Sequence, residues 1–358
     1  MNSLELFKNY YLEEKEILDN KLEELNNKLL VEDNDLVLNN IKLLTNLNSE
    51  GKLIRGILVK LGYSLLEDDK NYADDMALAY EMFQTAILVH DDIIDNDQKR
   101  RGKDTIHFAN ENYYGKYSNN KDEVKHLSNS IAICMGDYGL FVANKIVCDR
   151  YYDDPNLGKV LANFNNTVLT TIKGELIDVI LPFNGKHNLL SNKEIDNNII
   201  EIYRLKTAYY TIIGPLSVGI ILAGGLEDKL KDIESFGEKV GIAFQIQDDI
   251  LGIYSNEMGK IKGSDIKEFK QTILYSHILD TEYKDELLEY YGKEDINSDI
   301  INRVQELFKI SGSYDYAYNL MNKMYDESLD ILNNISWMSD DKKELLRGFV
   351  EYLRKRNK

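Results

Sequence analysis

Positions 88–95 read Leu88-Val89-His90-Asp91-Asp92-Ile93-Ile94-Asp95. They close residues 76–94, a helical pattern in which Glu81 is the only charged residue before His90. A mostly apolar helix of this kind is typical of a central element that other elements surround. Asp91 and Asp95 are four residues apart and share a face, with Asp92 at its edge. These carboxylates are therefore expected at the mouth of whatever space the helix lines.

Hard oxygen ligands on one helix face suit Mg²⁺, which binds one or two carboxylates together with water and phosphate oxygens. A solvated helix end is the alternative, because runs of charge are usually exposed. A basic run follows at once, Lys99-Arg100-Arg101-Gly102-Lys103. Guanidinium groups match phosphate oxygens bidentately. Carboxylates and arginines this close together favour a site that binds phosphate partly through a metal and partly directly.

A second acidic helix end lies far along the chain, at Phe244-Gln245-Ile246-Gln247-Asp248-Asp249. If the two helices face each other, their aspartates could hold metal ions on both sides of one anionic group. Taken singly, a lysine or arginine is usually a surface residue, so the prediction depends on the whole set. That set also includes the basic residues Lys52, Arg55, Lys206, Lys260 and Lys270.

The pattern of the whole chain predicts an all-α fold. Apolar residues recur with helical spacing, and alternating strand patterns are nearly absent. The sequence has 358 residues but only 3 prolines, which leaves room for long uninterrupted helices. We interpret residues 1–358 as a single domain, because none of the polar stretches between the helices resembles a long linker.

Composition excludes several classes of function. The net charge of −18 disfavours binding to nucleic acid or to anionic membranes. The 2 cysteines cannot form a disulfide framework, which favours a reducing, cytoplasmic location. Residues 209–226 carry no charge and approach the length of a membrane span. Their glycines and proline favour a broken, buried helix pair, so we expect no stable membrane insertion.

Together these residues resemble the trans-isoprenyl diphosphate synthases, the polyprenyl synthetase family. Residues 91–95 with Arg100-Arg101-Gly102 look like the family's first aspartate-rich motif, and residues 244–249 look like the second. The resemblance runs from about residue 51 to residue 270. It implies a bundle of antiparallel helices around a deep apolar cavity, usually in a homodimer. It also implies head-to-tail 1′–4 condensation of isopentenyl diphosphate with an allylic diphosphate.

The resemblance further implies a role for each matching residue, with a cluster of three Mg²⁺ ions on the allylic diphosphate. The implied metal ligands are Asp91, Asp92, Asp95, Asp248 and Asp249. The implied contacts to the allylic leaving group are Arg100, Lys206 and Lys260, and Lys270 also falls at a substrate-binding position. The implied ligands of isopentenyl diphosphate are Lys52, Arg55, Gln84 and Arg101. Thr207 and Gln245 would stabilise the allylic cation, and they join Asp91, Asp92 and Lys206 as the implied catalytic residues.

Four positions depart from the family's commonest pattern. Gly56 stands where proline is frequent, and Gln84 stands where many members have histidine. Glu175 replaces a frequent glutamine, which adds a negative charge near the expected metal site. Gly252 replaces the last aspartate of the second cluster, where Asp265 could assist through a metal-bound water.

Product length depends on the residues that precede Asp91. Helix geometry places Ile87, Gln84 and Phe83 successively deeper near one face, at ~1.5 Å per residue. Members that stop at farnesyl tend to carry bulky aromatic residues at the positions of Ala86 and Ile87. The cavity is therefore expected to continue to Phe83, and geranylgeranyl diphosphate is the expected product. Farnesyl or longer polyprenyl diphosphates are the alternatives, and Phe83 could also be ordinary core packing.

Three other functions compete with this interpretation. A terpene cyclase also needs metal-binding aspartates and an apolar cavity, but it does not need Lys52, Arg55 and Gln84. A non-catalytic prenyltransferase subunit predicts eroded aspartates, whereas both clusters are present here. An acidic helical scaffold with no catalytic function is the third alternative.

Overall fold

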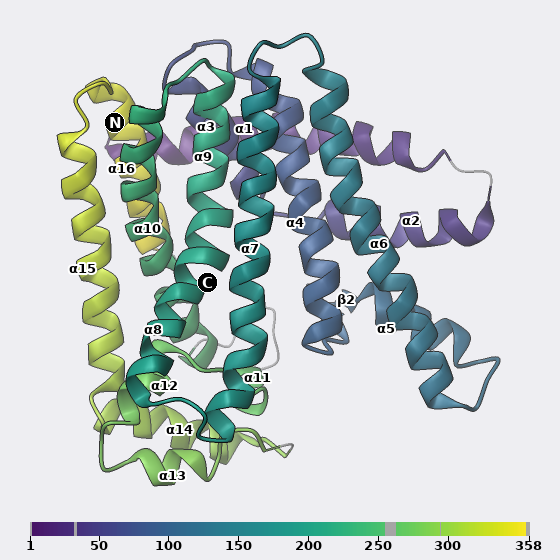
Figure 1. Cartoon of the computed structure of the whole chain (residues 1–358), viewed down its shortest axis with the longest axis vertical. Coiled ribbons are helices and arrows are strands. Elements are labelled where there is room, and N and C mark those ends of the chain that lie inside the picture. The colour runs from purple at the N-terminus through teal and green to yellow at the C-terminus, as the bar shows by residue number, and fades with distance from the viewer. Residues whose placement is uncertain (1, 32–33, 255–262, 294, 356–358) are drawn as a thin grey trace. The chain divides into compact units, whose positions relative to one another are not determined.

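The computed structural model describes residues 2–31, 34–254, 263–293 and 295–355, and this part is helical almost throughout (Figure 1). One short hairpin provides its β-structure. The prediction of an all-α fold is confirmed. The residues group into two compact units, and each is described by itself. The interpretation of residues 1–358 as a single domain stays a prediction.

The α4 unit comprises residues 9–163 and 215–225. Its elements are α1 (Ser3–Leu29, from residue 9), α2 (Asp35–Asn48), α3 (Ile54–Ser64), the 3-10 helix η1 (Lys70–Ala73), α4 (Asp74–Ile94), β1 (Lys99–Arg100), β2 (Lys103–Asp104), α5 (Ile106–Tyr114), α6 (Lys121–Arg150), the start of α7 (Leu157–Lys186) and most of α9 (Gly214–Leu222).

Helix α4 is the central element of this unit, as its sequence predicts. It packs most extensively against α6 and also against α3 and α2. Met76, Tyr80 and Phe83 are fully buried. Burial of this helix among several others explains why most of its residues are apolar. Its middle nevertheless carries the polar residues Glu81, Gln84 and Thr85.

A buried group of charges joins three helices of the α4 unit. Lys60 of α3 is fully buried, and its Nζ lies 2.5 Å from Glu14 Oε2 of α1 and 2.5 Å from Asp74 Oδ1 at the start of α4. Charges can be buried in this way only when opposite charges are placed beside them. The three residues therefore hold the middle of α3 and the N-terminal end of α4 to α1.

The α10 unit comprises residues 1–8, 164–214 and 226–358. Its elements are the rest of α7, α8 (Asn192–Ile202), the π-helix η2 (Tyr203–Ile213), α10 (Glu227–Tyr254), α11 (Ser264–Lys267), α12 (Ile273–Ile278), α13 (Lys284–Leu288), α14 (Ser298–Ile310), α15 (Ser313–Asn334) and α16 (Asp340–Arg354).

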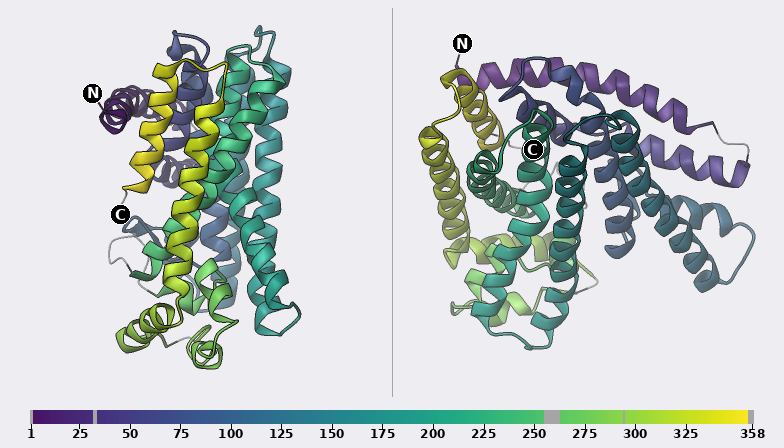
Figure 2. Two further views of the ribbon diagram at one scale, coloured as in Figure 1. Left: turned by 90° about the vertical axis from the view of Figure 1, so that its left-hand side faces the viewer. Right: turned by 45° about the horizontal axis from the view of Figure 1, so that its top comes forward.

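Helix α10 organises the core of this second unit. It packs against α15 and η2, and α15 in turn packs against α16. The two C-terminal helices are seen side by side in the left view of Figure 2, in yellow. Phe236, Val240 and Ile246 of α10 are fully buried. The second acidic cluster therefore extends from a helix that is anchored on several sides.

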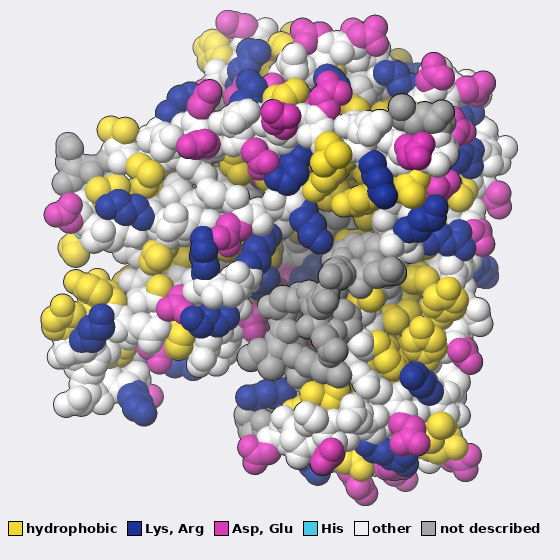
Figure 3. Space-filling view, turned by 180° about the vertical axis from the view of Figure 1, so that it is seen from behind, with side chains coloured by type: hydrophobic (Ala, Val, Ile, Leu, Met, Phe, Trp, Pro, Cys, Tyr) yellow, Lys and Arg dark blue, Asp and Glu magenta, His cyan; other side chains and the backbone are white. Residues whose placement is uncertain are grey.

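Two segments of the described chain are long and apolar enough to cross a membrane, by length and composition alone. They are Lys121–Arg150 and Asn192–Leu222, and their apolar windows are 39% and 89% buried inside the protein. Core helices of soluble proteins pass the same test, because a helix buried on all sides is also apolar all round. On the face in Figure 3, basic and acidic side chains are interspersed. The absence of membrane insertion stays a prediction.

Candidate active site

The first acidic cluster occupies the C-terminal end of α4. Asp91 and Asp92 lie in its last turn, and the amide of Asp95 closes the helix by donating to the Asp91 carbonyl at 2.8 Å. The C-terminal end of a helix is the negative end of its dipole, so carboxylates there are unfavourable without a cation. This end of α4 therefore requires positive charge.

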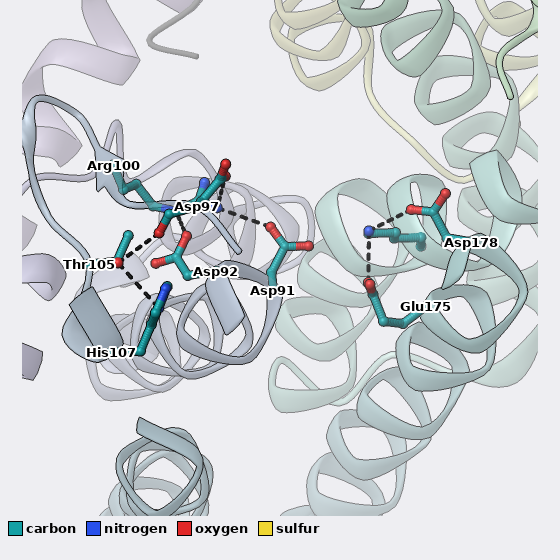
Figure 4. A network of polar contacts seen from close by, with 9 residues as sticks. Asp91, Asp92, Asp97, Arg100, Thr105, His107, Glu175 and Asp178 are labelled. Atoms are coloured by element: carbon teal, nitrogen blue, oxygen red, sulfur yellow. Dashed lines mark hydrogen bonds and ion pairs between the residues drawn. The ribbon is translucent and has the colours of Figure 1, made fainter. Parts of the chain in front are cut away.

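The β1–β2 hairpin supplies that charge. Arg100 pairs with Lys103 across the hairpin, and the two residues of its turn, Arg101 and Gly102, both have positive φ, at 52° and 82°. Such a turn favours glycine and matches the twist of the two strands. The hairpin folds the chain back, so that the side chain of Arg100 returns to the helix end (Figure 4).

Arg100 binds both aspartates of the last turn. Its Nε donates to Asp92 Oδ1 at 2.5 Å, its Nη2 donates to Asp91 Oδ2 at 3.0 Å, and Asp97 Oδ2 lies 3.7 Å from Nη2. Asp92 is 1% exposed. Burial raises the pKa of Asp92 to about 7, and the charge of Arg100 offsets only part of this rise. Arg100, which is a predicted diphosphate ligand, thus forms ion pairs with Asp91 and Asp92, which are predicted metal ligands.

The second acidic cluster is organised by a chain of hydrogen bonds between η2 and α10. Asp249 is 2% exposed, and one of its oxygens accepts from the Tyr203 hydroxyl. Its Oδ1 accepts from Gln245 Nε2 at 2.9 Å, and Gln245 Oε1 in turn accepts from Thr207 Oγ1 at 2.5 Å. Burial raises the pKa of Asp249 to about 7 against the opposing charge of Lys270. The structure therefore brings together Thr207, Gln245 and Asp249, as predicted for one site.

Lys206, predicted to contact the allylic diphosphate, lies in the π-helical segment η2. Short π-helical segments are rare and frequent at functional sites. Its Nζ is 2.7 Å from Glu175 Oε2 and 2.8 Å from Asp178 Oδ2, both on α7 (Figure 4). A lysine is thus already balanced by two carboxylates in the protein itself.

Two of the predicted ligands of isopentenyl diphosphate, Arg55 and Arg101, act electrostatically on a buried carboxylate. Glu81 of α4 is 3% exposed, and its Oε1 accepts from the amide of Gly56 at 2.7 Å. Burial raises the pKa of Glu81, and this hydrogen bond and the charges of Arg55 and Arg101 act against the rise. Burial, together with repulsion from Arg100 and Arg55, also lowers the pKa of Arg101. The charges of Arg55 and Arg101 therefore both act on this carboxylate, and Lys52 precedes them at an exposed position.

The residues predicted to set product length differ in their surroundings. Phe83 is fully buried, and its ring centroid lies 6.2 Å from that of Tyr80. Ala86 is also fully buried and lies against Gly139 of α6. A Cβ added to Gly139 would lie 2.9 Å from the Ala86 Cβ. Gln84 and Ile87 are half-buried. A larger side chain at position 86 would meet α6, so Ile87 is the better position for testing the predicted wall.

The comparison with known proteins decides the family. The polyprenyl synthetase family model matches residues 39–308. The chain belongs to the polyprenyl synthetase family.

Relatives with known names cover most of the chain. It is 29% identical to the geranylgeranyl diphosphate synthase of Sulfolobus acidocaldarius, over 87% of this chain and 88% of that protein. It is 30% identical to a short chain isoprenyl diphosphate synthase of Methanocaldococcus jannaschii, with the same coverage of 87% and 88%. Its fold is similar to the Corynebacterium glutamicum geranylgeranyl pyrophosphate synthase solved with isoprenyl diphosphate and magnesium, with a TM-score of 0.85. That likeness has 24% identity and covers 95% of this chain and 98% of the other.

Two departures of this family member have a structural explanation. The amide of Gly56 donates to Glu81, and a proline at this position would have no N–H to donate. At Gly252, a Cβ would lie 2.9 Å from Asp265 Oδ2, so the Asp265 carboxylate occupies the space that a side chain at position 252 would need. Asp265 therefore supplies an acidic group next to position 252, where the family's second motif usually has its last aspartate.

The donor set of the α4 cluster fits a divalent ion that is shared with other ligands. Asp92 Oδ2 is buried and accepts no hydrogen bond from the described residues. In the same part of the chain, no three His, Cys, Asp or Glu side chains are grouped to hold a metal ion by themselves. Mg²⁺ commonly takes only one or two carboxylates and completes its shell with water and phosphate oxygens. The aspartates fit such a partial site.

Some functional positions could not be identified from spacing. Tyr203 and Asp178 make the contacts that fix Asp249 and Lys206, yet their partners are 46 and 28 residues away. The single charge of Glu81 in an apolar helix was a visible signal, but it did not reveal the contact with Gly56. The predicted contact of Lys260 lies outside the described residues. The assigned roles of all these site residues stay predictions.

The environment of Glu81 predicts a pH-dependent effect of Glu81→Gln on stability. Because the pKa of Glu81 is higher in the folded than in the unfolded protein, its contribution to stability is fully present below the unfolded pKa, about 4.3. It is lost as the pH rises through the folded pKa. Relative to the wild type, the variant should therefore gain stability between pH 4 and pH 8. Urea unfolding at each pH measures the difference.

Glu16→Gln is the matched control, because it removes the same charge from an exposed position on α1. Its stability difference from the wild type should change little over this range. A stability difference for Glu81→Gln that stays constant with pH would contradict the assignment.

Proposed function

We propose that this member of the family condenses isopentenyl diphosphate head-to-tail with an allylic diphosphate. The observation that carries the proposal is the pair Asp91 and Asp92 on the last turn of α4, with Arg100 across them, in a chain of the polyprenyl synthetase family. In this reaction the bond between C1 and oxygen of the allylic diphosphate breaks. C4 of isopentenyl diphosphate then bonds to that carbon, and the released diphosphate takes the proton lost from C2.

The residues of the chain would share the work of stabilising the leaving diphosphate. Asp91, Asp92 and Asp248 would hold magnesium, in a proposed cluster of three ions, and these ions would neutralise charge on the departing oxygens. Arg100 and Lys206 would add direct charge-assisted hydrogen bonds. Asp249 has both oxygens engaged by Tyr203 and Gln245, so its proposed contribution is to orient Gln245 next to the aspartate at position 248.

Thr207 is suited to face a carbocation. Its hydroxyl proton is donated to Gln245 Oε1 at 2.5 Å, which leaves only oxygen lone pairs to point elsewhere. Oxygen dipoles aimed at developing positive charge lower its energy in a water-poor site. The Thr207–Gln245 pair therefore supports the ionisation step and needs no protein base.

The pair Arg55 and Arg101 above Glu81 favours a condensing enzyme over a terpene cyclase. A cyclase ionises a single diphosphate substrate and has no use for a second anion site. The charges of both arginines act on the same buried carboxylate, Glu81, and a diphosphate would add further negative charge to compensate them. We therefore assign isopentenyl diphosphate to this position, with Lys52 and Gln84 at its edge.

The direct test supplies Mg²⁺, isopentenyl diphosphate and each short allylic primer, and it measures the products by chromatography. Asp92→Asn should lower turnover by about 100-fold or more, because a neutral amide cannot replace a carboxylate in holding the metal. Asp104→Asn is the matched control, since Asp104 lies in the same hairpin region and pairs with Lys99 instead. The thermal midpoints of both variants check that they fold. Full activity of Asp92→Asn would refute the metal assignment.

We propose geranylgeranyl diphosphate as the main product, with farnesyl diphosphate as the alternative. The half-buried Ile87 lies one turn before Asp91, on the face of α4 that bears the aspartate. Ile87→Phe should therefore shorten the product, from twenty carbons to fifteen, while the first condensation on a five-carbon primer keeps its rate. The same product distribution in the variant and the wild type would remove Ile87 from the wall.

We also propose that the chain forms a homodimer through the exposed face of α7. Six apolar side chains recur there at helical spacing, each at least 44% exposed, namely Leu169, Ile172, Leu176, Val179, Ile180 and Phe183. A continuous exposed apolar stripe is uncommon on a monomer. A second copy offers the same stripe, as a two-fold interface requires.

A cytoplasmic location is likewise proposed.

Light scattering tests the dimer. The wild type should show twice the chain mass of 41.4 kDa, and Ile180→Glu should shift it toward the monomer because a charge would be buried at the interface. Leu12→Glu, at an exposed position on α1, should leave the dimer intact. A monomeric wild type would exclude this interface.

A further inference from the structure

Lys206 is held between two carboxylates of α7. The distances from its Nζ are 2.7 Å to Glu175 Oε2 and 2.8 Å to Asp178 Oδ2. All three side chains are largely buried, with 26%, 19% and 20% of the side-chain surface exposed for Lys206, Glu175 and Asp178. Water therefore screens these charges less than it would at the surface.

The backbone enforces this arrangement. A Cβ on Gly174 would lie only 2.7 Å from the amide nitrogen of Lys206. Helix α7 therefore passes η2 at a distance that only glycine permits. Glu175 and Asp178 are three residues apart and share the face that meets η2. Glu175, which follows Gly174 in the chain, is thus fixed beside Lys206.

The three residues carry a net charge of −1. Lys206 brings one positive charge, whereas Glu175 and Asp178 bring two negative charges. With glutamine at position 175, which is frequent in the family, the same group would be neutral. In this chain the two negative charges of Glu175 and Asp178 outweigh the positive charge of Lys206. An anion that approaches Lys206 is therefore attracted less strongly.

We propose that Glu175 is a positioning residue that competes with the diphosphate of the allylic substrate for Lys206. It thereby weakens the binding of allylic diphosphates at this site. The inference rests on the proposed function, because it takes Lys206 as a ligand of the allylic diphosphate.

The competition has a consequence for turnover. The product of each condensation is itself an allylic diphosphate, so the same lysine also retains the product. Release of product limits the rate of many enzymes. If Glu175 pairs again with Lys206, product release would be faster. The same competition would lower the affinity for the allylic substrate.

Glu175→Gln tests the inference because it removes the charge and keeps the shape. Binding of inorganic diphosphate in the presence of Mg²⁺, measured by calorimetry, should tighten by about fivefold, the scale of a partly exposed ion pair. The KM for the allylic diphosphate should fall with it, whereas the KM for isopentenyl diphosphate should stay unchanged. Steady-state kcat should also fall, while the rate of a single turnover is preserved.

Two further variants separate charge from structure. Glu201→Gln removes a carboxylate of the same unit that pairs with Arg204, and diphosphate binding should not change. Glu175→Asp keeps the charge and should bind diphosphate close to the wild-type level. Thermal midpoints check the fold of each variant.

Unchanged or weaker diphosphate binding by Glu175→Gln would overturn the inference, and so would an equal effect of Glu201→Gln. These outcomes differ from failure of the proposed function. In that case the wild type itself would form no product from an allylic diphosphate and isopentenyl diphosphate.

Discussion

Charges buried at the ends of apolar helices must be matched by opposite charges, and the candidate site depends on this constraint. Helix α4 ends in carboxylates at the negative end of its dipole, and Asp92 is almost fully buried there. Arg100 supplies the matching charge. The β1–β2 hairpin folds the chain back so that Arg100 contacts Asp92 at the end of α4. In the other unit, Lys206 is matched by Glu175 and Asp178. The need to compensate charges that are shielded from water thus applies to both groups of ion pairs, although the second lies inside its helices.

The cations that match these carboxylates are also the groups proposed to bind diphosphate. Arg100 and Lys206 each form ion pairs with two carboxylates of the chain. Binding of a metal-bound diphosphate to either cation would therefore exchange its ionic partners for others. Such an exchange keeps the charges compensated at each stage, because the metal can take the carboxylates while the phosphate takes the cations.

The departures from the family pattern illustrate the same compensation. A glycine at position 56 leaves an amide that donates to the buried Glu81, where proline would leave that carboxylate without this partner. A glycine at position 252 leaves space that the Asp265 carboxylate uses. Each change is matched by a polar group from another part of the same unit.

The sequence alone determined that the chain is all-α and that 76–94 form a central helix that aspartates close. It also placed the second pair of aspartates on α10, although this helix continues past them to Tyr254. These features depend on spacing along one helix, and local periodicity encodes them directly. The family resemblance likewise followed from the order of short motifs.

Only the tertiary structure decided which charges meet. The contacts Tyr203–Asp249, Lys206–Asp178 and Glu81–Gly56 join residues 46, 28 and 25 positions apart. No local period predicts them, because they arise where separate helices come into contact. Glu175 was visible in the sequence as an added charge, but its partner was not. The physical reason is that the cost of burying a charge depends on its neighbours in space, and the order of residues specifies these only through the fold.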